Sequence, residues 1–115
     1  MRLAAIVFLF STTAVHAQTI YLNYGQWLQM PTSFRQMYIA GAFDALSVLA
    51  TPQQAPVARY FNECVAKAGL TTAELAQNVK EYGEAQPDML GKPTPHVLGR
   101  YLISLCGLPG GGPEG

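Results

Sequence analysis

The chain has 115 residues, 50% of them hydrophobic, and its seven Lys and Arg are balanced by seven Asp and Glu. This length suits one compact domain and leaves little room for two. Because no segment is strongly basic, nucleic acids and anionic membranes are excluded as preferred partners.

The first 17 residues have the pattern of a secretory signal peptide. Arg2 gives a positive start, an unbroken apolar run follows over residues 3–10, and Val15 and Ala17 are the small residues that signal peptidase accepts. We expect cleavage between Ala17 and Gln18. An uncleaved anchor is the alternative, but the run is well short of the roughly 20 residues that span a bilayer. The pattern therefore predicts an exported bacterial protein of the periplasm, with no membrane contact after cleavage.

The two cysteines, Cys64 and Cys106, agree with export. An even pair in an exported chain is typical of a disulfide. The loop that it closes, roughly 43 residues, is worth about 4 kcal/mol in the chain-entropy model. A metal site is the alternative, but there is no CxxC motif and only His96 lies near in sequence. We expect a disulfide, no metal and no cofactor.

Apolar residues at three- and four-residue steps predict four helices after an extended lead-in over residues 18–24 and a short turn over 25–30. The four helices are expected at residues 33–50, 56–68, 71–85 and 95–106.

The helix over residues 33–50 has the clearest stripe, which includes Phe34, Met37 and Val48 and is wide enough to face a core. Gly41 lies inside it, at a cost of about 1 kcal/mol relative to Ala. Such a glycine usually lets another backbone come close.

Local signals mark the ends of the later helices. Gly69 suits the end of the second helix, Thr71 and Glu74 have the spacing of a capping box, and Thr94 can cap the last helix. The predicted fold is all-α, a compact bundle of about four helices with one disulfide over residues 18–107. A Gly- and Pro-rich tail over 108–115 is expected to be disordered.

No pattern in the chain indicates catalysis. There is no phosphate-binding loop, HExxH, GxSxG or paired-carboxylate motif, and His96 has no partner that would make it a base. Asp44 and Asn78 fall where an apolar residue is expected. We interpret both as buried structural hydrogen-bonding groups rather than as a recognition or catalytic acid, because a lone carboxylate lacks an acid/base partner.

Three aromatic residues, Tyr21, Tyr24 and Trp27, cluster before the first long helix. Trp and Tyr are enriched at binding hot spots, so these three are candidates for partner binding. They are also ordinary core residues, and for Trp27 the core is the favoured interpretation.

An ordered set of short segments resembles the Rap/Tai immunity-protein family, also called the type VI secretion amidase immunity family. The segments span nearly the whole chain after residue 17. They are Gly25-Gln26-Trp27, Tyr38-Ile39-Ala40-Gly41-Ala42-Phe43-Asp44, Cys64, Gly69-Leu70-Thr71-Thr72-Ala73-Glu74-Leu75, Val79-Lys80-Glu81-Tyr82 with Pro87, and a last helix that ends in Cys106.

The resemblance implies a periplasmic, all-helical inhibitor that is not an enzyme. Members of this family bind and block a peptidoglycan hydrolase, an amidase or endopeptidase, delivered by type VI secretion, and are often homodimers. Their disulfide cysteines correspond to Cys64 and Cys106, whereas their inhibitory residues do not carry over. The alternative is a stand-alone envelope protein, such as an acid-stress chaperone-like protein of similar fold.

Overall fold

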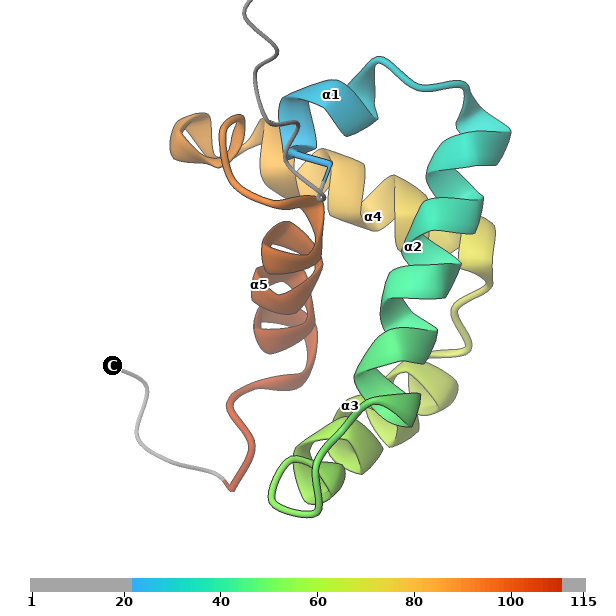
Figure 1. Ribbon diagram of the computed structural model, residues 1–115, viewed down its shortest axis with the longest axis vertical. Coiled ribbons are helices and arrows are strands. Elements are labelled where there is room, and N and C mark those ends of the chain that lie inside the picture. Colours follow the sequence, from blue (N-terminus) through green and yellow to red (C-terminus); the bar gives the residue numbers. More distant parts are fainter. Residues whose placement is uncertain (1–21, 111–115) are drawn as a thin grey trace, which may run out of the picture.

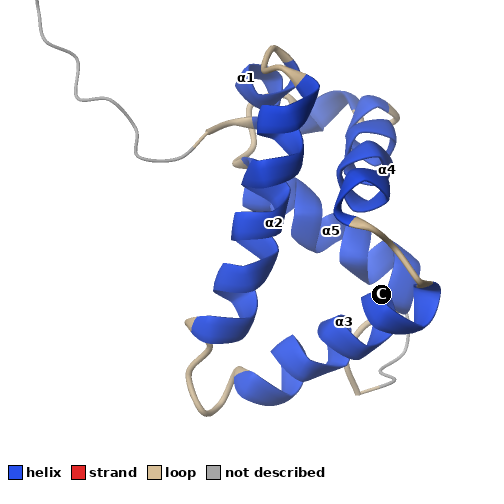
Figure 2. Ribbon diagram, turned by 90° about the vertical axis from the view of Figure 1, so that its right-hand side faces the viewer, coloured by secondary structure: helices blue, strands red, loops and turns tan. Residues whose placement is uncertain are grey.

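The computed structural model describes residues 22–110, which are helical and contain no strand. The predicted signal peptide over residues 1–17, its expected cleavage between Ala17 and Gln18, Tyr21 and residues 111–115 lie outside these residues. The elements are α1 (Tyr24–Leu28), α2 (Thr32–Val48), α3 (Ala55–Ala68), α4 (Thr72–Glu84), a 3-10 helix η1 (Pro87–Met89) and α5 (Thr94–Cys106). The predicted all-α fold with four long helices is confirmed (Figure 2). Within residues 22–110, no helix is both long and apolar enough to cross a membrane.

Two helices begin with a capping box. Thr71 accepts from the Glu74 amide at 3.1 Å and the Glu74 carboxylate accepts from the Thr71 amide at 2.9 Å, as the sequence predicts. Asn23 and Gln26 form a second capping box, at α1, which was not predicted from the sequence. Each box satisfies two amide groups at the start of its helix. The two boxes therefore fix where α1 and α4 begin.

The expected cap of the last helix is wrong. Pro93 occupies the N-cap position of α5, and the Thr94 hydroxyl donates instead to the Leu22 carbonyl at 2.7 Å. The Thr94 amide donates to the same carbonyl at 2.9 Å, and the Tyr24 amide donates to the Lys92 carbonyl at 2.8 Å. These bonds fasten the segment before α1 to the loop before α5, so that α1 lies across the ends of α4 and α5 (Figure 1).

The core lies where α1, α4 and α5 meet the first half of α2. Every helix supplies at least one buried apolar residue, but α2 supplies only Ile39 and α3 supplies only Val65. The buried apolar residues of the core are Tyr24, Trp27, Ile39, Val65, Leu75, Ala76, Val79, Met89, Val97, Leu98 and Leu102. The packing is therefore concentrated at one end of the molecule, and the second half of α2 and most of α3 contribute little to it.

The predicted core stripe of α2 is wrong. Phe34, Met37 and Val48 are 47%, 74% and 79% exposed, whereas Ile39 on another face of the helix is fully buried. Because α2 is apolar on several faces, its periodicity does not determine which face packs. Gly41 also departs from expectation, since no described atom outside its own helix backbone and chain neighbours comes within 4 Å of the position that a Cβ would occupy.

The disulfide between Cys64 and Cys106 is present, as predicted, and joins α3 to the end of α5. The two Cα atoms are 6.0 Å apart, an ordinary span for this bond. The Tyr60 hydroxyl also contacts this end of α5, donating to the Cys106 and Gly107 carbonyls. Together, these bonds hold α3 against α5 where buried apolar contact is sparse.

Candidate partner-binding groove

A half-open groove of about 550 Å³ lies between the second half of α2, α3 and one face of α5. Its walls are mainly large apolar side chains. They are Phe43, Leu46 and Leu49 from α2 and its end, Val57 and Phe61 from α3, and Leu102 and Ile103 from α5. The volume is within the range of about 300–1,000 Å³ that is typical of ligand-binding clefts.

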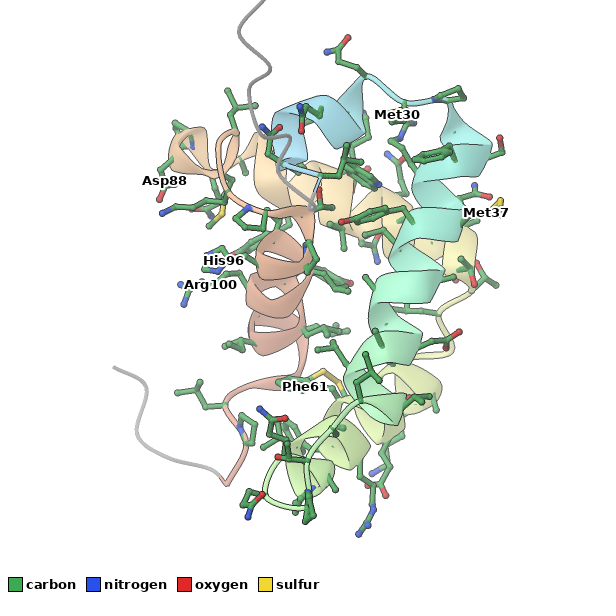
Figure 3. All side chains as sticks on the ribbon, in the orientation of Figure 1. Met30, Met37, Phe61, Asp88, His96 and Arg100 are labelled. Atoms are coloured by element: carbon green, nitrogen blue, oxygen red, sulfur yellow. A yellow bond between two sulfur atoms is a disulfide. The ribbon has the colours of Figure 1, made fainter. Side chains whose placement is uncertain are left out.

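The groove is deep and apolar at its floor and exposed at its rim. Leu102 at the floor is 1% exposed, whereas Leu46 and Leu49 at the rim are 45% and 76% exposed. Phe61 points from α3 into the space between α2 and α5 (Figure 3). A partner that covers the rim would therefore remove large apolar side chains from water.

Among the described residues, no ionisable side chain lines the groove. Its polar groups are amides, and one of them holds the walls together: the Asn62 amide nitrogen donates to the Ser47 hydroxyl at 2.5 Å and to the Ala58 carbonyl at 2.8 Å. Gln54 faces its own loop, where its side chain accepts from the Thr51 amide at 3.2 Å. Recognition in this groove would depend on shape and apolar burial rather than on charge.

The structure places Tyr24 and Trp27 in the core. The interpretation of Trp27 as a core residue is confirmed, whereas Tyr24 is too deeply buried to serve as the partner-binding candidate that the sequence suggests. Tyr24 and Trp27 are 1% and 0% exposed, and their rings stack with centroids 5.9 Å apart. The Trp27 indole donates to the Arg35 carbonyl at 3.3 Å and the Tyr24 hydroxyl donates to the Lys80 carbonyl at 2.6 Å. Hydrogen bonds join the segment before α1 to the loop before α5, and in this position of α1 both rings point into the core. Tyr21, the third candidate, lies outside the described residues.

Burial raises the pKa of Tyr24 to about 12, and the nearby Glu84 carboxylate adds to this effect. The phenol is thus a neutral hydrogen-bond donor inside the fold at physiological pH.

Asp44 and Asn78, which were both expected to be buried, differ in their exposure to solvent. Asp44 is exposed on α2, so its predicted burial is wrong. Asn78 is half-buried, and its amide donates to the Tyr101 hydroxyl at 3.0 Å, which links α4 to α5. This is the kind of structural bond that was expected of Asn78. Asp44 takes its position on the outer side of α2 because the opposite side packs on the core.

His96 is exposed in the first turn of α5, where it points away from the bundle beside Arg100 (Figure 3). Across residues 22–110, no group of three or more His, Cys, Asp or Glu residues could hold a metal ion.

The groove has no pattern of its own in the sequence because its lining comes from three helices. Leu46, Val57 and Ile103 are far apart in sequence and meet only in the fold. One signal was available: residues 42–50 are apolar on almost every side, which is more than one core-facing stripe needs.

Comparisons of the chain with protein-family models, curated proteins and solved structures found no match.

Proposed function

We propose that this protein is an exported bacterial binding protein that receives an apolar segment of a protein partner in the groove between α2, α3 and α5. The observation that carries the proposal is an apolar groove with exposed rim residues in a chain of this size. Monomeric soluble proteins rarely leave large apolar patches open unless the patch binds something.

The energetics of the groove suit tight binding. Burying a Leu or Val side chain fully is worth about 1.5–3 kcal/mol, and Leu46, Leu49 and Val57 are each more than two-fifths exposed. The Asn62–Ser47 bond and the disulfide hold the walls in place, so that little ordering accompanies binding. Because the lining carries no charge, affinity should vary little with salt.

We further propose that the partner is a peptidoglycan hydrolase effector delivered by type VI secretion, which this protein inhibits as an immunity protein of the periplasm. This step rests on the signal-peptide pattern and on the resemblance to the Rap/Tai family. The Cys64–Cys106 disulfide is compatible with an oxidising compartment. The inhibitor would act by occupying the enzyme's cleft.

The test is a pull-down with tagged protein from envelope extracts of the source bacterium, followed by mass spectrometry. We expect one stoichiometric peptidoglycan hydrolase, captured by the wild type and lost with Leu49→Lys at the groove rim. The matched control is Leu90→Lys, which places the same charge on an exposed leucine after η1, away from the groove. Purified hydrolase should then lose its activity on peptidoglycan when the wild type is added.

Two outcomes would oppose the immunity role. Many weak clients, captured equally by both variants and more strongly at low pH, would favour the acid-stress chaperone-like alternative. A folded bait that captures no hydrolase from cells expressing one would favour a stand-alone envelope protein.

A further inference from the structure

One wall of the groove, α3, is held weakly by the rest of the fold. Of the residues in α3, only Val65 is buried, whereas α5 on the other side of the groove buries Val97, Leu98 and Leu102. The segments that join α3 to its neighbours, residues 49–54 and 69–71, contain no buried residue. The α3 wall can therefore move while the core stays packed.

The polar attachments of α3 depend on its disulfide. Within the described part of the chain, two side chains of α3 donate hydrogen bonds to another element. Asn62 donates to Ser47 near the end of α2 at 2.5 Å. Tyr60 donates to the Cys106 and Gly107 carbonyls, the latter at 3.2 Å. Both acceptors of Tyr60 lie at the end of α5 that the disulfide fixes, so the covalent bond is the main attachment between α3 and α5.

We propose that oxidation controls binding, because the groove is complete only when the Cys64–Cys106 disulfide has formed. This inference rests on the proposed function, since it takes the groove as the binding site. In the dithiol form, noncovalent contacts alone hold α3, and its groove-lining residues Val57 and Phe61 move away from α5. The chain is then unable to bind in a reducing compartment and becomes able to bind after export to an oxidising one.

The chemical step is thiol–disulfide exchange with an oxidant that is itself a disulfide. The thiolate of one cysteine attacks a sulfur of the oxidant, displaces the other oxidant sulfur as a thiolate and forms a mixed disulfide. The second cysteine thiolate then attacks its partner's sulfur and displaces the remaining oxidant thiolate. The pair of cysteines loses two electrons and two protons, and the oxidant leaves as two thiols. Cys64 and Cys106 are both partly exposed, so a reagent can reach them without unfolding the core.

Fluorine NMR on protein purified after export and labelled with 4-fluorophenylalanine tests the movement of α3. Phe61 points into the groove from α3, whereas Phe34 on α2 lies outside the groove and is the internal reference (Figure 3). We expect dithiothreitol to shift the Phe61 resonance to the position of a solvated ring and oxidised glutathione to restore it, with Phe34 constant. Trp27 should keep the fluorescence of a buried indole, because its ring partner Tyr24 and its hydrogen-bond partner Arg35 lie outside α3.

Two variants make this measurement specific. Phe61→Leu assigns the Phe61 resonance. Tyr60→Phe removes the hydrogen bonds to the end of α5 and keeps the disulfide, so the oxidised variant should keep its Phe61 resonance near the wild-type position. A Phe61 resonance that does not respond to reduction, or a Trp27 indole that is exposed at the same time, would contradict the proposal. A shift in oxidised Tyr60→Phe as large as that caused by reduction would do so as well.

Binding to the purified hydrolase connects the redox state with function. We expect the dissociation constant to rise by about tenfold or more in dithiothreitol, because the binding-competent fraction falls to roughly a tenth or less, and to recover on reoxidation. The double variant Cys64→Ser/Cys106→Ser should bind weakly and not respond to dithiothreitol, which controls for effects on the hydrolase. Equal affinities of the two redox forms would overturn redox control. An oxidised wild type that binds no hydrolase would instead contradict the proposed function, while the fluorine measurement still decides whether oxidation completes the groove.

Discussion

At the scale of single residues, the contact between Tyr24 and Gly83 shows how closely α1 is seated on α4. A Cβ at Gly83 would lie 2.4 Å from the Tyr24 ring, a distance that real side chains do not reach. Tyr24 is 1% exposed and its hydroxyl is bonded to the Lys80 carbonyl, so the ring has no free direction in which to move. Gly83 is therefore required by packing, although its φ angle is not in the left-handed region.

We expect Gly83→Ala to lower the free energy of unfolding by about 1–3 kcal/mol, because the added methyl group overpacks the α1–α4 contact. Urea denaturation measures this change. Gly99→Ala is the control: Gly99 also lies inside a helix, but the space around it is open. It should leave stability unchanged or raise it by up to about 1 kcal/mol. Equal effects of both substitutions would disprove the packing explanation.

The raised pKa of Tyr24, about 12, predicts a pH dependence. In the unfolded chain this phenol ionises near its ordinary pKa of 10, whereas the folded protein keeps the proton up to about 12. Its contribution to stability is therefore complete below pH 10 and is lost as the pH rises through 12. Tyr24→Phe should cost about 1 kcal/mol at pH 8 through the lost hydrogen bond.

That cost should shrink between pH 10 and pH 12, which denaturation of both proteins at several pH values would show. A cost that is constant across this range would mean that the Tyr24 pKa is not raised in the folded state.

At the scale of elements, the helices differ in how firmly their ends are fixed. α4 begins with the Thr71–Glu74 capping box and buries Leu75 and Val79, so local and tertiary signals agree there. α2 has neither a side-chain cap nor one dominant apolar face. This difference explains why the sequence predicts the start of α4 correctly but assigns the wrong face of α2 to the core.

We expect Thr71→Ala to destabilise the protein by about 1 kcal/mol, because the Glu74 amide loses its acceptor. Thr72→Ala changes the neighbouring exposed threonine, which carries no cap, and should stay within about 0.5 kcal/mol of the wild type. Thermal unfolding of the two variants in parallel measures the difference. A larger loss for Thr72→Ala would show that the cap is not the source of the effect.

At the scale of the whole molecule, α3 is held less by the core than α4 and α5 are. It contributes only Val65 to the buried residues, and its attachment depends on the disulfide, on Tyr60 and on the Asn62–Ser47 bond. Because α3 forms one wall of the groove, the same attachments maintain the shape of the groove. Under the proposed function, partner binding and stability would therefore both depend on these attachments.

Replacing both cysteines with serine should lower the free energy of unfolding by about 2–4 kcal/mol, by releasing the loop that the disulfide closes. Hydrogen exchange should then accelerate most in α3 and least in α4, which retains its core contacts. Capture of the partner should fall with the loosening of α3. Uniformly faster exchange in both helices would show that the disulfide stabilises the whole fold rather than this wall.

The helical fold, the main breaks between helices, the Thr71–Glu74 cap and the Cys64–Cys106 pair are all predictable from the sequence, because they depend on periodicity, on local hydrogen bonds and on a count of cysteines. The folded arrangement of the helices was needed to show that Tyr24 is buried, that Met37 is exposed and that Leu49 borders a groove. An apolar side chain has the same pattern in sequence whether it fills the core or lines a binding surface. The difference arises from which neighbours the fold brings to it, and here the core is complete before α2 and α3 have used all of their apolar residues.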